Sequence, residues 1–363
     1  MPTLFDPIQL GAIHAPNRIL MAPLTRGRSE GAHVPDTALK AEYYSQRASA
    51  GLLIAEATGI TQEGSGWPAA PGIWSDAQVA AWQPVTQAVH EAGGRIILQL
   101  WHMGRLVHPD FLGGAQPVSS SATTAPGFAH TAEGKKPYVE ARMLALSEIP
   151  RVIADYVHAA RNAIRAGFDG VQIHSANGYL IDQFLRDNSN FRTDAYGGPI
   201  ENRIRLLREV TQAVADAVGA ERTSVRLSPN GESQGADDSN PVALFTAAAA
   251  MLHEIGIGFL ELREQKDFGN FGKTDIPRVS PEIRKVFSGP LILNQEYNLE
   301  RAEADLASGL ADGISFGRPF ISNPDLVERL RLDAPIAPDN FKTWYSAGPE
   351  GYTDYPLLEM ASE

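Results

Sequence analysis

Short runs of leucine and β-branched residues recur along the chain, and each is followed by a polar or glycine-containing turn and then by a longer segment rich in alanine, leucine and arginine. This alternation is typical of parallel strand–helix units. Eight such units predict an α/β fold of the (β/α)8 TIM-barrel class. The expected strands are Ile19–Ala22, Leu52–Ala57, Ile96–Leu100, Gly170–His174, Ser224–Leu227, Phe259–Leu262, Leu291–Asn294 and Gly313–Phe316.

Helical periodicity is clearest in four segments, where apolar positions return at steps of three and four residues. These helices, expected to form the outer ring, are Asp76–Glu91, Glu148–Ala166, Glu201–Val218 and Pro241–Glu254. Before the first strand, Ile8–Leu10 and Ile13–Ala15 flank Gly11, which indicates an N-terminal hairpin that closes the bottom of the barrel. The alternative for this segment is an irregular arm.

A long excursion rich in Gly, Pro and Ser, Met103 to Ser147, follows the third strand. Loops of this length are usually functional or mobile. The chain shows no change in composition that is typical of an interdomain linker, and one barrel with insertions reaches this length. We therefore expect residues 1–363 to form a single domain.

Composition narrows the classes of function. The formal net charge of -12 disfavours nucleic-acid and membrane partners and favours a small molecule. Without cysteine, the chain cannot form disulfides or cysteine-ligated metal sites, so redox chemistry would need a bound cofactor. No leader-like apolar core occurs in the first twenty residues, and the longest apolar stretch is far shorter than the about 18 residues of a membrane span. We expect a cytoplasmic protein and leave homo-oligomerisation open.

Two nucleotide-binding motifs are missing or broken. An open sheet that binds a dinucleotide would carry G-x-G-x-x-G after its first strand, and this motif does not occur. Gly269–Thr274 resembles the end of a Walker A loop, but Asp267 stands where the first glycine is required.

Polar side chains gather at the carboxyl ends of the expected strands, which is the face where barrel enzymes build their sites. These residues are Thr25, Gln99, His174, Arg226 and Arg318. Because they come from five different strands, they are expected to converge on one cavity that suits a flat polar cofactor.

The segments around these residues resemble successive motifs of the Old Yellow Enzyme family, in order and over nearly the whole chain. The likeness is greatest to the bacterial branch that contains N-ethylmaleimide, morphinone, pentaerythritol tetranitrate and 2-cyclohexenone reductases. The motifs are MAPLTRGR, QLWHMGR, HSANGYLIDQFL, NFRTDAYGG, ENRIRLL, RLSPNG and SFGRPFISNPDLV. The resemblance implies an NADPH-dehydrogenase-type ene-reductase, which holds FMN noncovalently, takes hydride from NADPH or NADH, and reduces C=C bonds activated by carbonyl, imide or nitro groups.

The resemblance also assigns a flavin site. The Thr25 hydroxyl would donate to flavin O4, and the Arg226 cation would lie near N1 and O2, where it stabilises the reduced ring. Arg318 would hold the phosphate at the usual barrel position. The full implied set is Pro23, Leu24, Thr25, Ala57, Gln99, Arg226, Gly317 and Arg318.

Simpler interpretations exist for the two arginines. For Arg226 the alternative is a surface salt bridge, and Arg318 alone would equally pair with Asp325 on the surface. After the seventh strand, Asn294-Gln295-Glu296 stands where many relatives carry a glycine-containing phosphate turn. Because a carboxylate would repel phosphate, we expect the Glu296 side chain to point away while backbone N–H groups face the phosphate; contacts at this turn stay unassigned.

Three residues after the fourth strand carry the implied chemistry. His174 and Asn177 would donate hydrogen bonds to a carbonyl, nitro or imide oxygen of the substrate. Tyr179 would protonate the α-carbon after hydride passes from flavin N5 to the β-carbon. The alternatives are a histidine that satisfies buried backbone groups and a tyrosine that serves only as an aromatic wall.

Aromatic residues are expected to shape the substrate pocket. By the resemblance these are Trp67, Trp101, Phe268 and Tyr352, with Phe271 at the mouth. A flat nicotinamide would share this pocket and leave before the alkene enters, which gives ping-pong kinetics.

Two other classes of function stay open. A metal-dependent barrel hydrolase would use histidines such as His102 and His108, but no H-x-H or H-E-x-x-H motif supports it. A non-catalytic flavin-binding protein would need the cofactor residues alone.

Overall fold

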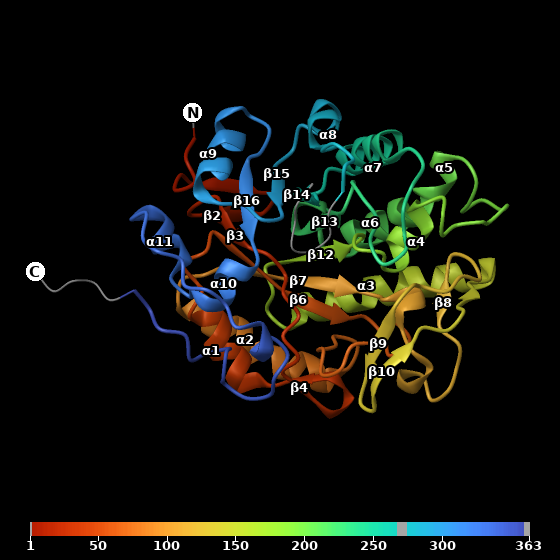
Figure 1. Cartoon of the computed structure of the whole chain (residues 1–363), viewed down its shortest axis with the longest axis horizontal. Helices are drawn as coiled ribbons and strands as arrows, with labels where there is room; N and C mark the ends of the chain where they lie inside the picture. Colours follow the sequence, from red (N-terminus) through yellow and green to blue (C-terminus); the bar gives the residue numbers. More distant parts are fainter. Residues whose placement is uncertain (1, 267–273, 359–363) are drawn as a thin grey trace, which may run out of the picture.

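The eight expected strands form one closed parallel barrel (Figure 1). The structure is a computed structural model that describes residues 2–266 and 274–358. Around the barrel the strands follow one another in chain order, which confirms the predicted fold class, and their ends lie within two residues of the expected ones. They are β3 Ile19–Met21, β6 Leu52–Gly59, β7 Ile96–Trp101, β12 Gly170–His174, β13 Thr223–Leu227, β14 Phe259–Arg263, β15 Leu291–Asn294 and β16 Gly313–Phe316.

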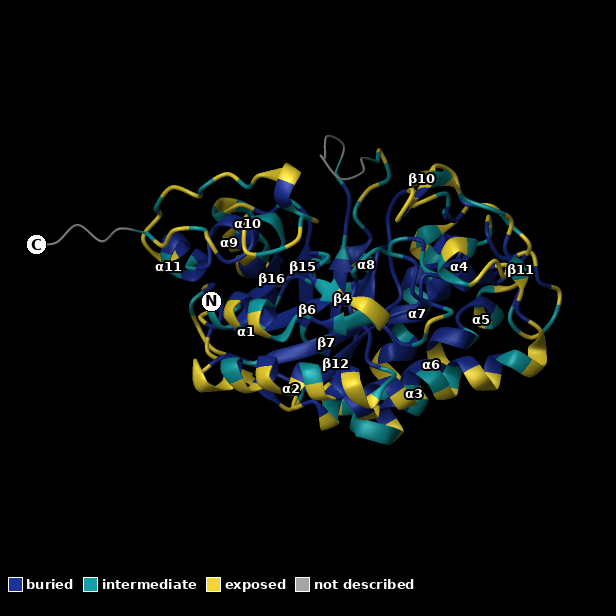
Figure 2. Ribbon diagram, turned by 90° about the horizontal axis from the view of Figure 1, so that it is seen from below, coloured by how far each residue is buried: buried dark blue, intermediate teal, exposed yellow. Residues whose placement is uncertain are grey.

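Helices cover the outside of the barrel, with exposed residues on their outer faces and buried residues toward the strands (Figure 2). Ser75 and Gln78 form a capping box at the start of α2, which satisfies N–H groups that a helix end would otherwise leave unpaired. The helices are α1 Thr37–Ser45, α2 Asp76–Glu91, α3 Ile149–Arg165, α4 Leu180–Leu185, α5 Ile200–Arg203, α6 Arg205–Val218, α7 Pro241–Ile255, α8 Ser280–Val286, α9 Leu299–Ala307, α10 Arg318–Ser322 and α11 Leu326–Arg331.

The four expected outer helices form, but one of them is divided and several ends shift by one residue. The segment predicted as one helix from Glu201 divides at Ile204, whose ψ of -6° ends α5 before α6 begins. Glu148 closes a 3-10 turn instead of starting α3, which begins one residue later with proline in its first turn.

The N-terminal hairpin closes the lower end of the barrel. Its strands, β1 Ile8–Leu10 and β2 Ile13–Ala15, pair antiparallel. Their buried side chains form one apolar cluster with residues from the barrel strands, including Leu52 and Phe259, the first residues of β6 and β14. The hairpin prediction is confirmed, and the irregular arm is not what forms.

The excursion after β7 is folded. It contains a parallel pair, β8 Val118–Ser119 with β11 Arg142–Met143, and an antiparallel hairpin, β9 Phe128–Thr131 with β10 Gly134–Pro137. Ser119 and Ser120 each donate a hydrogen bond to Gln183 of α4 at 2.8 Å, which ties the excursion to the segment that follows β12. None of the helices within residues 2–266 and 274–358 has the length and apolar character needed to cross a bilayer.

Gly11 provides a test of the hairpin's packing. Its φ is +59°, and a Cβ there would lie 2.0 Å from the Glu221 carbonyl oxygen. Gly256 has a similar φ of +76° but open space around its Cβ position, so Gly256→Ala is the matched control. Both changes share the backbone penalty of about 1–2 kcal/mol. Gly11→Ala is expected to lower the free energy of unfolding by about 1–3 kcal/mol more, because of overpacking, as measured in urea. Equal losses of unfolding free energy in the two variants would show that the hairpin shifts to accept the added methyl group without a packing cost.

Candidate functional site

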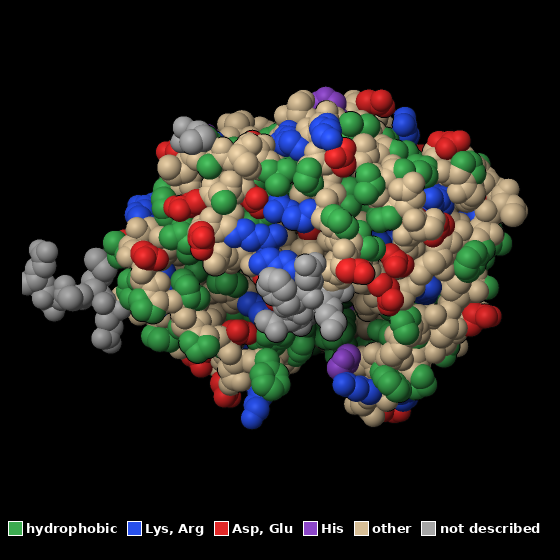
Figure 3. Space-filling view, turned by 45° about the horizontal axis from the view of Figure 1, so that its top comes forward, with side chains coloured by type: hydrophobic (Ala, Val, Ile, Leu, Met, Phe, Trp, Pro, Cys, Tyr) green, Lys and Arg blue, Asp and Glu red, His purple; other side chains and the backbone are tan. Residues whose placement is uncertain are grey.

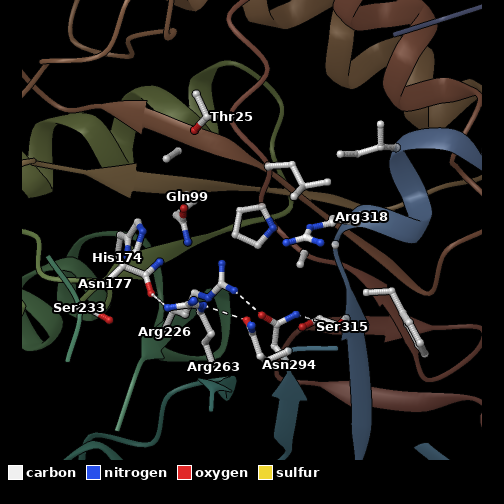
Figure 4. Close-up of a pocket in the computed structure, with 18 of the residues that line it drawn as sticks. Thr25, Gln99, His174, Asn177, Arg226, Ser233, Arg263, Asn294, Ser315 and Arg318 are labelled. Carbon is white, nitrogen blue, oxygen red and sulfur yellow. Dashed lines mark hydrogen bonds between the residues drawn. The ribbon is translucent and has the colours of Figure 1, made fainter. Parts of the chain in front are cut away.

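A cavity of about 770 Å³ opens at the carboxyl ends of the barrel strands, within the usual size range of small-molecule sites. In Figure 4, Arg318 lies across this cavity from His174 and Asn177. All but two of the predicted site residues line it: Pro23, Leu24, Thr25, Ala57, Trp67, Gln99, Trp101, His174, Asn177, Tyr179, Arg226, Gly317 and Arg318. Of the other two, Phe268 lies outside the described residues, as does Phe271, and Tyr352 lies elsewhere.

A buried carboxylate organises the floor of the cavity. Glu261 of β14 has no exposed surface, and its two oxygens accept hydrogen bonds from Gln172 at 2.9 Å and Ser315 at 2.5 Å. The Arg226 Nε lies 3.4 Å from the same carboxylate. Buried ionised groups are tolerated only when they are paired and hydrogen-bonded, and Glu261 meets both conditions.

Arg226 lines the cavity and is not a surface ion pair. Its side chain is almost fully buried, and besides Glu261 it donates a hydrogen bond of 2.6 Å to Asn294 Oδ1 at the end of β15 (Figure 4). Asn294 in turn donates to the Ser315 carbonyl at 2.7 Å. These contacts fix the guanidinium at the cavity floor, where a permanent cation stabilises negative charge on a bound ring.

Gln99 is fixed by the same layer. Its Nε2 donates to Gln172 Oε1 at 2.8 Å, and Gln172 donates to Glu261. Because the amide nitrogen of Gln99 is directed to Gln172, its carbonyl oxygen is left to accept from a ligand in the cavity.

The cation side of the cavity suits a phosphate. A Cβ on Gly317 would meet only Leu24, at 3.4 Å, so the surrounding protein leaves room at this position for a ligand to approach the backbone closely. Asp325, the other partner considered for Arg318, forms an ion pair with Arg329 at 2.7 Å. Gln295 and Glu296 also line the cavity with φ of +99° and +52°, so this turn has the backbone form that glycine usually provides.

Tyr179 lies among the groups expected to act on substrate. Its ring packs edge-on against His174, with centroids 4.8 Å apart, and against Trp101 at 5.1 Å. His174 Nδ1 and Trp101 Nε1 are buried without a hydrogen-bond partner in the described part of the chain. Such atoms carry a desolvation penalty that a bound ligand would remove.

Burial sets the protonation of this group. It lowers the pKa of His174 well below its ordinary range, with the Arg226 and Arg263 cations adding to the effect, so the imidazole is neutral. It raises the pKa of Tyr179 above that of a free phenol, so Tyr179 keeps its proton at neutral pH.

The aromatic wall differs from expectation at one residue. Tyr352 is fully buried and stacks on Tyr43 with centroids 4.0 Å apart, and it is not among the residues lining the cavity. The wall is made by Tyr345, which faces Trp67 at 5.2 Å, and by Trp344.

Two arginines that follow β3 explain why Tyr345, and not Tyr352, lines the cavity. Arg28 donates to the carbonyl oxygens of Thr343, Trp344, Gly348 and Glu350 and to Ser346 Oγ. Arg26 donates to the Trp344 and Gly351 carbonyls. These bonds hold residues 343–351 beside Thr25, with Tyr345 turned to the cavity and Tyr352 turned to the core.

Arg263, the last residue of β14, also lines the cavity and was not predicted. It donates to Asn177 Oδ1 at 2.9 Å and to Gln295 Oε1 at 3.0 Å. Its position at a strand's carboxyl end, which identified Arg226, was the available signal.

Positive charge gathers around the site although the chain is acidic. Lys and Arg side chains form a band across the face shown in Figure 3. Burial and the nearby cations Arg301 and Arg278 lower the pKa of Lys266, which lies close to the cavity's Glu296. Such a local field attracts anionic cofactors.

The histidines proposed for a metal site do not converge. His102 lies 3.8 Å from Glu63, and His108 lies 3.2 Å from Asp110. Within residues 2–266 and 274–358, no group of three or more His, Asp or Glu side chains is placed to hold a metal ion. The hydrolase alternative therefore lacks a ligand set in that part of the chain.

Residues 3–335 match the model of the NADH:flavin oxidoreductase / NADH oxidase family. The chain belongs to this family. An old yellow enzyme homologue from Zymomonas mobilis is 63% identical, with a TM-score of 0.97 over 98% of this chain and 100% of that one. These findings confirm the predicted resemblance to Old Yellow Enzymes and the expectation of a flavin oxidoreductase.

Other members of the NADH:flavin oxidoreductase / NADH oxidase family are similar over nearly their whole length. Morphinone reductase, solved in complex with tetrahydroNAD, is 44% identical, with a TM-score of 0.94 over 100% of this chain and 99% of that one. A putative 12-oxophytodienoate reductase 11 from Oryza sativa subsp. japonica is 42% identical over 358 residues, which are 98% of this chain and 97% of the rice protein.

The Arg226–Glu261 pair is open to a direct test in protein freed of flavin. Arg226→Met leaves a buried carboxylate without its cation and is expected to lower the free energy of unfolding by about 3–5 kcal/mol. Adding Glu261→Gln removes the buried charge and should recover more than half of that loss. Arg208→Met, which breaks the exposed pair with Glu254, is the control and should cost about 1 kcal/mol or less. Additive losses in the double variant would mean that the two side chains do not depend on each other.

Proposed function

We propose that this protein is an FMN-dependent ene-reductase, which uses NADPH or NADH to reduce alkenes activated by carbonyl, imide or nitro groups. The observation that carries the proposal is the position of Tyr179. Its phenol, the unpartnered His174 nitrogen and the Asn177 amide face one cavity, whose floor is Gln99 and Arg226. This brings an oxygen-binding pair, a proton donor and a cofactor floor into a single space.

The residues present fit FMN. The fixed acceptor of Gln99 and the buried cation of Arg226 suit the polar edge of a flat ring, and the opening at Gly317 beside Arg318 suits a phosphate. Pro23, Leu24, Thr25 and Ala57 line the same cavity and would contact the ring. When bound, FMN would take a hydride from the nicotinamide and pass one to the alkene.

The protein's side chains would bind the substrate and supply the proton. His174, neutral because its pKa is lowered, and Asn177 would donate to the substrate oxygen and stabilise the charge that develops there. Tyr179, protonated because its pKa is raised, would give its proton to the α-carbon. Trp67 and Tyr345 would hold flat substrates and the nicotinamide in turn. The morphinone reductase solved with tetrahydroNAD supports a nicotinamide in this cavity.

A non-catalytic flavin-binding protein is the second candidate, since the cofactor residues alone do not require turnover. None of the described residues that line the cavity specifically favours the non-catalytic candidate. The unpartnered His174 nitrogen beside the protonated Tyr179 phenol favours catalysis.

Three further expectations from the sequence stay predictions: a cytoplasmic location, a single domain and the possible formation of a homo-oligomer.

An anaerobic spectrum tests cofactor, donor and acceptor together. Purified protein is expected to be yellow and to release FMN on denaturation, because its flavin contacts are noncovalent. NADPH or NADH should bleach the flavin absorbance, and 2-cyclohexenone should then restore it. Colourless protein that takes up no FMN would reject the proposal. Bound flavin that the nicotinamide does not bleach would favour the non-catalytic candidate, and flavin that bleaches but is not reoxidised by enones or nitroalkenes would reject alkene reduction.

Tyr179→Phe separates hydride transfer from protonation. Reduction of the flavin by NADPH should survive, while oxidation by an enone slows by a factor of about 10²–10⁴, because the enolate lacks its acid. A nitroalkene should react at close to the wild-type rate and accumulate nitronate, a stable anion, as followed by rapid-mixing absorbance. The matched control is Tyr156→Phe, which removes a fully buried phenol on α3 away from the cavity.

The raised pKa of Tyr179 also predicts how enone reduction depends on pH. Because the acid form persists above the ordinary phenol pKa of about 10, enone reduction should show no loss attributable to this group between neutral pH and that value. Equal slowing of enone and nitroalkene in Tyr179→Phe would indicate damaged geometry, and unchanged enone turnover would remove Tyr179 from the acid role.

A further inference from the structure

Asn177 can act as a hydrogen-bond donor only if its amide points the right way. The side chain has an accepting end, Oδ1, and a donating end, Nδ2, and a half-turn about its last bond exchanges them. A substrate carbonyl or nitro oxygen needs the donating end. Some neighbouring group must therefore distinguish the two orientations.

The backbone of Asn177 is already fixed. Its φ is +60°, a form that asparagine tolerates better than most residues. Its N–H donates to Ser228 Oγ at 2.8 Å, and its carbonyl accepts from Gln234 Nε2 at 2.9 Å. What these bonds leave undetermined is the direction of the side-chain amide.

Arg263 meets that amide from the end of β14. Its Nη1 donates to Asn177 Oδ1 at 2.9 Å (Figure 4), and its Nε donates to Gln295 Oε1 at 3.0 Å. A guanidinium has donors and no acceptor, so only the oxygen of the amide can face it. The opposite orientation would set two donors against each other.

We propose that Arg263 is a positioning residue, which fixes the Asn177 amide with Oδ1 on the guanidinium and Nδ2 toward the substrate oxygen. The proposal rests on the function proposed above and deepens it, because it names what makes Asn177 a donor. Arg263 acts through Asn177 and not through its own charge on the substrate. The Gln295 contact links this orientation to the turn after β15.

The protonation of Arg263 supports a permanent donor. Burial, with the Arg226 cation next in importance, lowers its pKa to about 10, so the guanidinium stays charged at neutral pH. Lysine could reach one acceptor but could not bridge Asn177 and Gln295 in a fixed plane.

The experiment is a double-mutant cycle in FMN-loaded protein. The dissociation constant of 4-hydroxybenzaldehyde is read from the long-wavelength charge-transfer band that its phenolate is expected to form over oxidised flavin. The KM for 2-cyclohexenone, a neutral ligand, is measured beside it. Arg263→Met should raise both by a similar factor of about five to ten, the size of one neutral hydrogen bond. In the Asn177→Ala background the same change should alter either value less than twofold.

Matched variants keep the result interpretable. Arg165→Met removes an exposed arginine of α3 that pairs with Asp76, and it should leave both constants unchanged. If Arg263→Met fails to hold FMN, Arg263→Lys replaces it. Its loss should be smaller, and it should likewise vanish in the Asn177→Ala background.

Several outcomes would overturn the inference. Unchanged constants in the Arg263 variants would show that Asn177 is oriented without them. A loss that persists after Asn177→Ala, and that is larger for the phenolate than for the enone, would show that Arg263 acts on ligand charge directly. If the wild-type protein neither forms the band nor reduces the enone, the proposed function itself fails and the inference fails with it. Wild-type turnover that weakens in Asn177→Ala, without coupling to Arg263, would overturn only the inference.

Discussion

The site depends on one buried carboxylate. Glu261 stands in the interior of the barrel with no exposed surface, and it needs the hydrogen bonds of Gln172 and Ser315 and the charge of Arg226 to remain there. Gln99 joins the same layer through Gln172. This one carboxylate thus fixes side chains from four other strands, and three of them, Gln99, Arg226 and Ser315, line the cavity. A network of this kind favours a single arrangement over alternatives of similar packing.

The cavity above this layer has two sides with different chemistry, and both carry arginines. One side holds the neutral donors and the phenol, where His174 and Tyr179 owe their protonation to burial. The opposite side holds Arg318, with the turn at Gln295 and Glu296 nearby. A chain with net charge -12 places Arg226, Arg263 and Arg318 around the cavity where an anionic cofactor would lie, although Glu232 and Glu296 also line it.

Most of the barrel was predictable because its strands are short apolar runs whose ends carry the functional side chains, and strand order follows chain order. What sequence reasoning missed depends on contacts between distant residues. Tyr352 was assigned to the cavity, and Tyr345 took that place because Arg26 and Arg28 bind the backbone around it. Arg263 was missed although it ends β14, since the sequence does not show its contact with Asn177. The last thirty residues have no periodic pattern that predicts whether the side chain of Tyr345 or that of Tyr352 faces the cavity.

The hydrogen bonds of Arg28 join residues that are 315 to 322 positions apart. During synthesis on a ribosome, the strands and helices can form in order as they emerge, but the wall containing Trp344 and Tyr345 has to wait for almost the whole chain. Closing so long a loop is entropically unfavourable until the barrel has brought the two ends near each other. The side of the cavity formed by Trp344 and Tyr345 can therefore be completed only after residues near the end of the chain have been made.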